Sequence, residues 1–121
     1  MANVTLEEAK RACDAAVARA QELGIRISVS VVDSGTILVA TNKMDRALII
    51  GVEGSRGKAV ASVIFGQPSG ELESRFARPT MQALTLQYGG KFIMGQGALP
   101  ITRDGEIVGA CGGRRRHVPG R

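Results

Sequence analysis

The stretch that decides the fold is residues 5–44, TLEEAKRACDAAVARAQELGIRISVSVVDSGTILVATNKM. Thr5 and Glu8 match a capping box at its start, and Gly24 is the residue type that ends helices in the left-handed conformation. Between them, apolar residues recur at the spacing of one helix face: Ala9, Ala12, Cys13, Ala16, Val17, Ala20 and Leu23. The pattern predicts a helix over 5–24, whose small side chains allow close packing on a sheet.

The second half of the stretch changes to the period of a β-strand. In IRISVSVVD, residues 25–33, isoleucine and valine alternate with arginine and serine. DSGT is typical of a turn, and ILVATNKM, residues 37–44, reads as a second strand. The two strands therefore predict a β-hairpin.

The remaining chain predicts a second helix and further strands. Residues 48–65 have apolar residues at helical spacing, although each glycine inside a helix costs about 1 kcal/mol relative to alanine. Such a cost is expected where a sheet, a neighbouring subunit or a ligand approaches the backbone. Residues 71–77 predict a short helix, and residues 88–113 predict three short strands, the last two joined by the turn Asp104-Gly105. Helices packed on a mostly antiparallel sheet define an α+β domain.

Composition limits the function classes. The 121 residues suit one domain, and with 3% aromatic residues stacking platforms for single-stranded nucleic acid are close to absent. The net charge is +5, but four of the 16 basic residues follow Gly113, so residues 1–113 are nearly neutral. Nucleic-acid binding through Arg114–Arg116 is therefore the least favoured hypothesis.

Two cysteines and one histidine predict neither a disulfide framework nor a metal site. A hydrolytic triad is disfavoured, because it needs a rigidly held histidine and His117 lies in the tail. The chain shows neither a signal peptide nor an apolar run near 18 residues, so we expect a cytoplasmic protein without a membrane partner.

Several polar residues are candidates for binding or catalysis. Asp45 follows the second strand and precedes the glycine-containing helix, where it is either an acid–base group near a ligand or a helix cap. Asp33 either caps the first turn or contacts a ligand. Arg56 and Lys58 are either solvated or anchors for an anionic ligand.

Two glycine-rich loops, YGGKF (88–92) and MGQGALP (94–100), lack the strand–loop–helix context of a phosphate-binding loop. Each is either a turn or the lining of a pocket, since glycine lets a ligand approach the backbone closely. In the second loop, Gly95 and Gly97 are candidate ligand-binding residues.

Three segments, in this order, resemble the GlcG/HbpS-like family of haem-binding-protein-like domains. They are residues 5–45, then GKAVASVIFGQPSGELE (57–73), then GGKFIMGQGALPITRDGEIVGACG (89–112). The resemblance covers about Val4 to Gly113. It implies a profilin-like fold, with a five-stranded antiparallel sheet flanked by helices in three α/β/α layers.

The resemblance also implies homo-oligomers, from dimers to octamers, and roles in haem or corrinoid binding beside catabolic enzymes. Haem iron takes an axial ligand from His, Cys, Met or Tyr, which makes Cys111 and His117 the candidates considered first. We therefore expect an oligomeric domain that binds a small molecule such as haem or a corrinoid. The alternative is a cofactor-independent isomerase, lyase or hydratase acting on a small oxygenated metabolite, with Asp45 as its acid–base group.

Residues 114–121, RRRHVPGR, depart from the family pattern, which continues with glycines, Thr-Ser-Gln-Asp and a final helix. Codons CGG CGG CGG CAC GTC CCA GGA CGA encode this tail and, shifted by one base, begin Gly-Gly-Gly-Thr-Ser-Gln-Asp. We expect one domain over 1–113 and an atypical basic tail over 114–121, which is either native or an out-of-frame reading of the usual ending. In the second case its charge and His117 say nothing about ligands.

Overall fold

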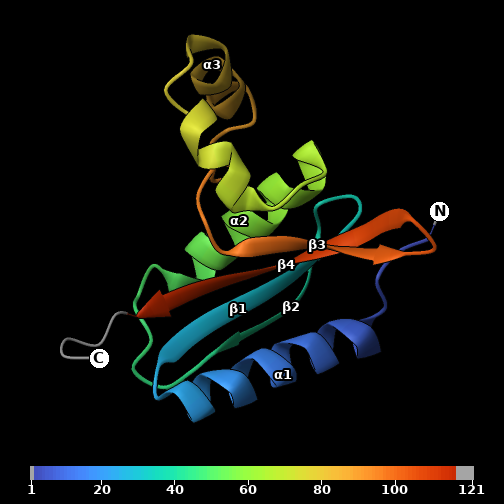
Figure 1. Cartoon of the computed structure of the whole chain (residues 1–121), viewed down its shortest axis with the longest axis vertical. Coiled ribbons are helices and arrows are strands. Elements are labelled where there is room, and N and C mark those ends of the chain that lie inside the picture. The colour runs from blue at the N-terminus through green and yellow to red at the C-terminus, as the bar shows by residue number, and fades with distance from the viewer. Residues whose placement is uncertain (1, 117–121) are drawn as a thin grey trace.

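The computed structural model describes residues 2–116, with side chains for residues 2–113. Its elements follow one another along the chain as Figure 1 shows: α1 (Leu6–Leu23), β1 (Arg26–Asp33), β2 (Leu38–Lys43), α2 (Gly51–Phe65), the 3-10 helix η1 (Ser69–Arg75), α3 (Pro79–Gln87), β3 (Ala98–Arg103) and β4 (Glu106–Arg116). None of the helices among these residues is long and apolar enough to cross a membrane.

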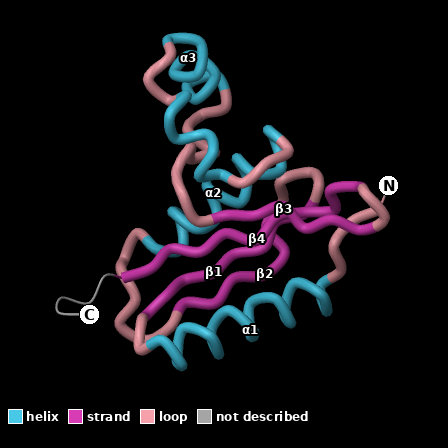
Figure 2. The backbone as a smooth tube through the Cα atoms, in the orientation of Figure 1, coloured by secondary structure: helices cyan, strands magenta, loops and turns pink. Residues whose placement is uncertain are grey.

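The strands form one antiparallel sheet in the order β2-β1-β4-β3, which confirms the α+β class (Figure 2). The expected fifth strand is wrong for the part of the chain that the structure describes, where four strands are found. Of the three strands expected within residues 88–113, the structure forms two, and residues 92–94 before β3 pack on α2 as a loop. The backbone N–H of Ile93 donates to the carbonyl of Gly57 at 2.9 Å, and Phe92 and Met94 are buried.

Helix α1 forms as its sequence predicts. Thr5 and Glu8 make both hydrogen bonds of the capping box, at 2.8 and 3.1 Å. Gly24 ends the helix with φ 68°, a conformation that glycine adopts at little cost. The turn between β1 and β2 and the Asp104-Gly105 turn between β3 and β4 also lie where the sequence predicts them.

The two faces of the sheet are covered by different helices. Val29, Val31 and Val108 pack in one buried cluster with Ala9 and Cys13 of α1. Val32 and Ala110 belong to a second cluster with residues of α2, namely Ala59, Val60 and Ala61. Since successive residues of a strand point to opposite faces, the sheet lies between α1 and α2.

Helix α2 begins at Gly51 rather than near Leu48, and it lies very close to β4. A Cβ atom on Gly112 of β4 would lie 2.1 Å from the carbonyl oxygen of Ser55. A second close approach occurs at Gly57, where a Cβ would lie 2.7 Å from the side chain of Ile93. The absence of a side chain at Gly57 and Gly112 therefore allows other parts of the same chain to pack closely there.

Residues 69–87, which comprise η1 and α3, form an arm that projects away from the sheet (Figure 1). Helix α3 was not expected from the sequence; it begins at Pro79, a residue favoured in the first helical turn. No residue of α3 itself is buried, although Met81 and Leu84 contact the core cluster below it.

The backbone of β4 continues through Arg114, Arg115 and Arg116, which pair with Ser28, Ile27 and Arg26 of β1. The expected domain boundary after Gly113 thus falls inside a strand, and the division into domain and tail stays a prediction. His117 lies outside the described residues.

Candidate functional site

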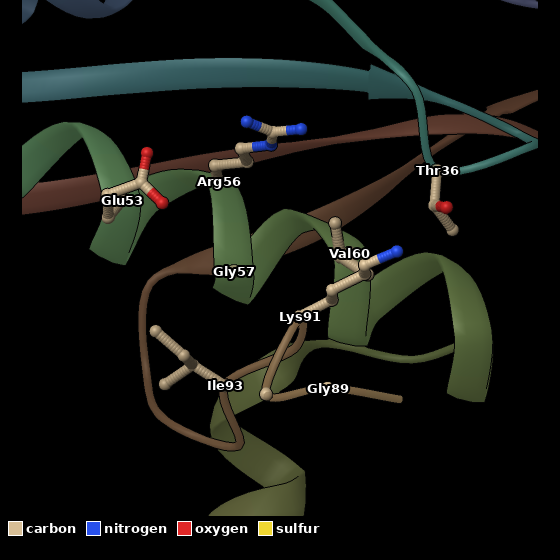
Figure 3. A pocket seen from close by; sticks show the side chains of 9 residues that line it. Thr36, Glu53, Arg56, Gly57, Val60, Gly89, Lys91 and Ile93 are labelled. Carbon is tan, nitrogen blue, oxygen red and sulfur yellow. The ribbon is translucent and has the colours of Figure 1, made fainter. Parts of the chain in front are cut away.

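A pocket of about 330 Å³ lies beside α2, within the range of roughly 300–1,000 Å³ usual for small-molecule sites (Figure 3). Three segments build it: α2, the β1–β2 turn, and the loop that follows α3. Its lining residues are Thr36, Glu53, Arg56, Gly57, Val60, Gly89, Gly90, Lys91 and Ile93.

Two cations from different elements border this pocket. Arg56 rises from α2, and Lys91 extends from the loop after α3 toward Thr36 (Figure 3). Both side chains are exposed, and the one carboxylate of the lining, Glu53, lies on the far side of Arg56 from Lys91. Val60 and Ile93 supply apolar wall. The arrangement suits a small anion, because Arg and Lys donate charge-assisted hydrogen bonds to carboxylate or phosphate oxygens.

The loop that carries Lys91 is positioned by glycines. Gly89 and Gly90 have φ angles of 66° and 72°, and they reverse the chain at the end of α3. The N–H of Gly90 donates to the carbonyl of Thr85 at 2.8 Å, which fixes this reversal. Because Gly57 has no Cβ, the loop then lies directly on α2, held by the bond from Ile93 to Gly57.

Of the residues proposed from sequence, Arg56 lines this pocket, and the two aspartates do not. One carboxylate oxygen of Asp33 accepts hydrogen bonds from the N–H groups of Gly35 and Ile37 at 2.9 and 3.0 Å, so this residue caps the β1–β2 turn. Asp45 is exposed in a turn between β2 and α2, and the residue at the N-cap of α2 is Ile50.

Lys58, Gly95 and Gly97 come together on another side of α2. Lys58 is only 8% exposed, so it is not solvated as a mid-helix lysine usually is. A Cβ on Gly95 would lie 3.7 Å from Cε of Lys58, and one on Gly97 would lie 3.1 Å from its Cδ. Gly97 also borders a second hollow of about 550 Å³ between η1 and β3, next to Glu71 and Gln96. A ligand-binding role for the three residues remains a prediction.

Cys111 lies on the α1 side of the sheet, where it packs against the cluster of Val29, Val31 and Val108. Burial raises the pKa of its thiol, and burial together with nearby Cys111 and Asp14 raises the pKa of Cys13 to about 11. The role of Cys111 as an axial ligand of haem iron stays a prediction. The pocket borders α2, on the opposite side of the sheet from these cysteines.

Sequence reasoning missed Lys91 and Glu53 as pocket residues. The available signal was YGGKF, where a cation directly follows two glycines, but only the fold shows that this loop meets Arg56.

The fold is that of a small α+β domain. Beside its second helix lies a pocket large enough for a small ligand, with Arg56 and Lys91 at its border. The chain belongs to the HbpS-like family, described as haem-degrading protein HbpS-like, whose model matches residues 4–113.

Solved structures that are similar over most of the chain include three that illustrate the family and its relatives. The Klebsiella pneumoniae protein ORFY is 25% identical, with a TM-score of 0.86, and the match covers 94% of this chain and 79% of that one. A double mutant of Streptomyces reticuli HbpS is 32% identical, with a TM-score of 0.82 and coverage of 94% and 75%. PduOC, solved as a haem complex, is 28% identical, with a TM-score of 0.80 and coverage of 93% and 82%.

Proposed function

We propose that this protein binds a haem-related small molecule through the carboxylates of that ligand, at the pocket between Arg56 and Lys91. The observation that carries the proposal is that these two cations both line one hollow, whose wall includes Val60 and Ile93. A tetrapyrrole with acidic side groups presents both the anions and the apolar surface that such a pocket accepts. The family and the haem complex of PduOC support this ligand class.

None of the residues that line this pocket can ligate the iron of haem. Axial ligands are His, Cys, Met or Tyr, and none of these is among the lining residues. Tyr88 precedes Gly89 in sequence, but its ring packs edge-on against Phe92 at 5.5 Å. The lining of this pocket therefore fits the acidic edge of a tetrapyrrole and not its metal, and we derive no chemistry through the iron.

We further infer that the protein acts as a cytoplasmic homo-oligomer, between dimer and octamer, accessory to a catabolic pathway. Large apolar side chains at the surface support association: Ile49, Leu86, Ile37 and Leu99 are 94, 82, 64 and 63% exposed. A solution mass equal to one chain, measured by sedimentation, would exclude the oligomer.

The alternative of a cofactor-independent isomerase, lyase or hydratase rests on Asp45. Since Asp45 is exposed outside the lining of the pocket, no observation among the described residues favours that alternative.

The binding proposal is tested by titrating the protein with haemin and with iron-free protoporphyrin IX. We expect similar dissociation constants for the two, because the pocket contacts carboxylates and not the metal. Arg56→Gln and Lys91→Gln should each weaken both ligands about tenfold, the usual size of a charge-assisted hydrogen bond. Lys10→Gln is the matched control, since it removes one positive charge from exposed α1 on the other side of the sheet.

Three results would contradict the proposal. If neither ligand binds, the ligand is not of the haem class. If haemin binds much more tightly than the iron-free porphyrin and its Soret band shifts, the iron is ligated. If both variants bind like the Lys10 control, the ligand sits elsewhere.

A further inference from the structure

The pocket beside α2 adjoins a second hollow of about 340 Å³ at the base of the arm. Gly90 and Ile93 line both hollows, so the two hollows are neighbours. The other lining residues of the second hollow are Phe76, Thr85, Phe92 and Met94.

The two hollows differ in chemical character. The first holds three charged side chains, those of Glu53, Arg56 and Lys91. The lining of the second is uncharged: two phenylalanines, a methionine and an isoleucine surround one threonine. Its floor is buried, since Phe92 and Met94 are 3% and 7% exposed.

Ile93 lies between the two hollows because the residues before and after it in the chain, Phe92 and Met94, are held in the core. The ring of Phe92 packs edge-on against Phe65 and Tyr88, at 5.5 Å in each case, and Met94 lies in the same core cluster. Between these two buried side chains, Ile93 is 39% exposed and is held to Gly57 through its N–H. Figure 3 shows its side chain diverging from that of Lys91.

The side chains at this boundary leave apolar surface open to solvent. Phe76, on the arm, is 46% exposed beside the partly exposed Ile93. An apolar body lying against both would remove this surface from water, which favours binding in proportion to the area covered. An anion alone would leave it uncovered.

We propose that the two hollows form one composite site, whose ligand is an amphiphilic anion with a flat apolar body. Carboxylates on one edge of the ligand lie at Arg56 and Lys91, and the apolar body crosses Ile93 to reach Phe76. Charge complementarity in the first hollow and the shared lining of Gly90 and Ile93 argue for this single occupant. This inference rests on the proposed function and extends it: the arm becomes part of the binding site.

If the site is composite, the affinity for a ligand depends on where the ligand carries its charges. Protoporphyrin IX carries its two carboxylates on one edge, whereas uroporphyrin carries carboxylates all around the same macrocycle. We expect at least tenfold tighter binding of protoporphyrin, because uroporphyrin would place charges against Phe76 and Ile93. Phe76→Ala should weaken protoporphyrin about tenfold and reduce that preference.

The matched control is Leu86→Ala, which removes an 82% exposed apolar side chain from the same arm outside the lining of the hollow. Both variants should melt close to the wild-type temperature, since neither side chain is in the buried core. If Phe76→Ala binds protoporphyrin like Leu86→Ala, or if uroporphyrin binds more tightly than protoporphyrin, the composite site is wrong. In that event, weakened binding by Arg56→Gln would leave the proposed function standing, and unchanged binding would overturn both.

Discussion

The two faces of the sheet are built by different means. Against α1, the sheet presents valines that meet alanine and cysteine in an apolar cluster. Against α2, it presents Ser28, Ser30 and Gly112, all buried or in direct contact with the helix backbone. The first face is held mainly by apolar area, with polar contacts such as that between Glu8 and Arg103 at its margin. The second combines backbone proximity and hydrogen bonds with its own apolar cluster, and it carries the candidate site.

Hydroxyl groups make the close contact at α2 tolerable. The Oγ of Ser30 lies 2.7 Å from that of Ser55 and 3.0 Å from Oγ1 of Thr41. Ser55 also donates to the carbonyl of Val52 at 3.0 Å. This chain of hydroxyl groups gives each buried oxygen a hydrogen-bond partner. A buried polar group without a partner would destabilise the fold by about 1–3 kcal/mol. The difference between the faces predicts different responses to substitution.

The largest effect is expected from Gly112→Ala. The added Cβ would lie 2.1 Å from the carbonyl oxygen of Ser55 and 3.0 Å from the N of Ala59, both backbone atoms of α2. Helix and strand must separate, so we expect the free energy of unfolding in urea to fall by about 3 kcal/mol. Gly113→Ala is the control, because its Cβ would meet nothing closer than 3.9 Å. Equal stabilities for the two variants would show that α2 moves without cost.

A smaller effect distinguishes the two serines of β1. Ser30→Ala removes the central member of the hydroxyl chain and should cost about 1 kcal/mol. Ser28→Ala should be neutral or stabilising, because the buried Oγ of Ser28 has no hydrogen-bond partner in the described part of the chain. Urea unfolding of the two variants gives the comparison, and a larger loss at Ser28 than at Ser30 would refute it.

The smallest effect concerns the α1 side and appears only in acid. The backbone N–H of Thr5 and the guanidinium of Arg103 hold the pKa of Glu8 at about 2, below its ordinary 4.5. The stabilisation is therefore complete above pH 4.5 and is lost as the pH falls toward 2. Glu8→Gln should flatten the pH dependence of thermal unfolding in this window. Glu7→Gln, which removes an exposed pair with Arg11, should leave the slope as in the wild type.

Elements with local signals were predictable from the sequence. The capping box of Thr5 and Glu8, the alternation in β1 and the Asp104-Gly105 turn each involve residues close together in the chain. Three strands were expected within residues 88–113 and two are found, because the apolar residues Phe92 and Met94 are buried from a loop rather than from a strand. Helix α3 escaped notice since none of its residues is buried.

The candidate site was only partly predictable, because it is made by distant segments. Arg56 was proposed as an anion anchor, but its partner Lys91 belongs to a loop whose position depends on the contact between Gly57 and Ile93. Lys58 was proposed on the same grounds as Arg56, two residues away on the same helix, and is buried instead. Helical spacing places the two on different sides of α2, but it does not say which side the fold covers.

The order of strands has a consequence for how the chain folds. The central pair of the sheet joins β1, near the start of the chain, to β4, the last described strand to be synthesised. Until β4 emerges, β1 has one unpaired edge, and β3 has no strand to join. Pairing across so long a separation makes folding slow, and an unpaired edge of this kind invites association with other chains. We therefore expect the newly made chain, rather than the finished domain, to be the form most in need of a chaperone.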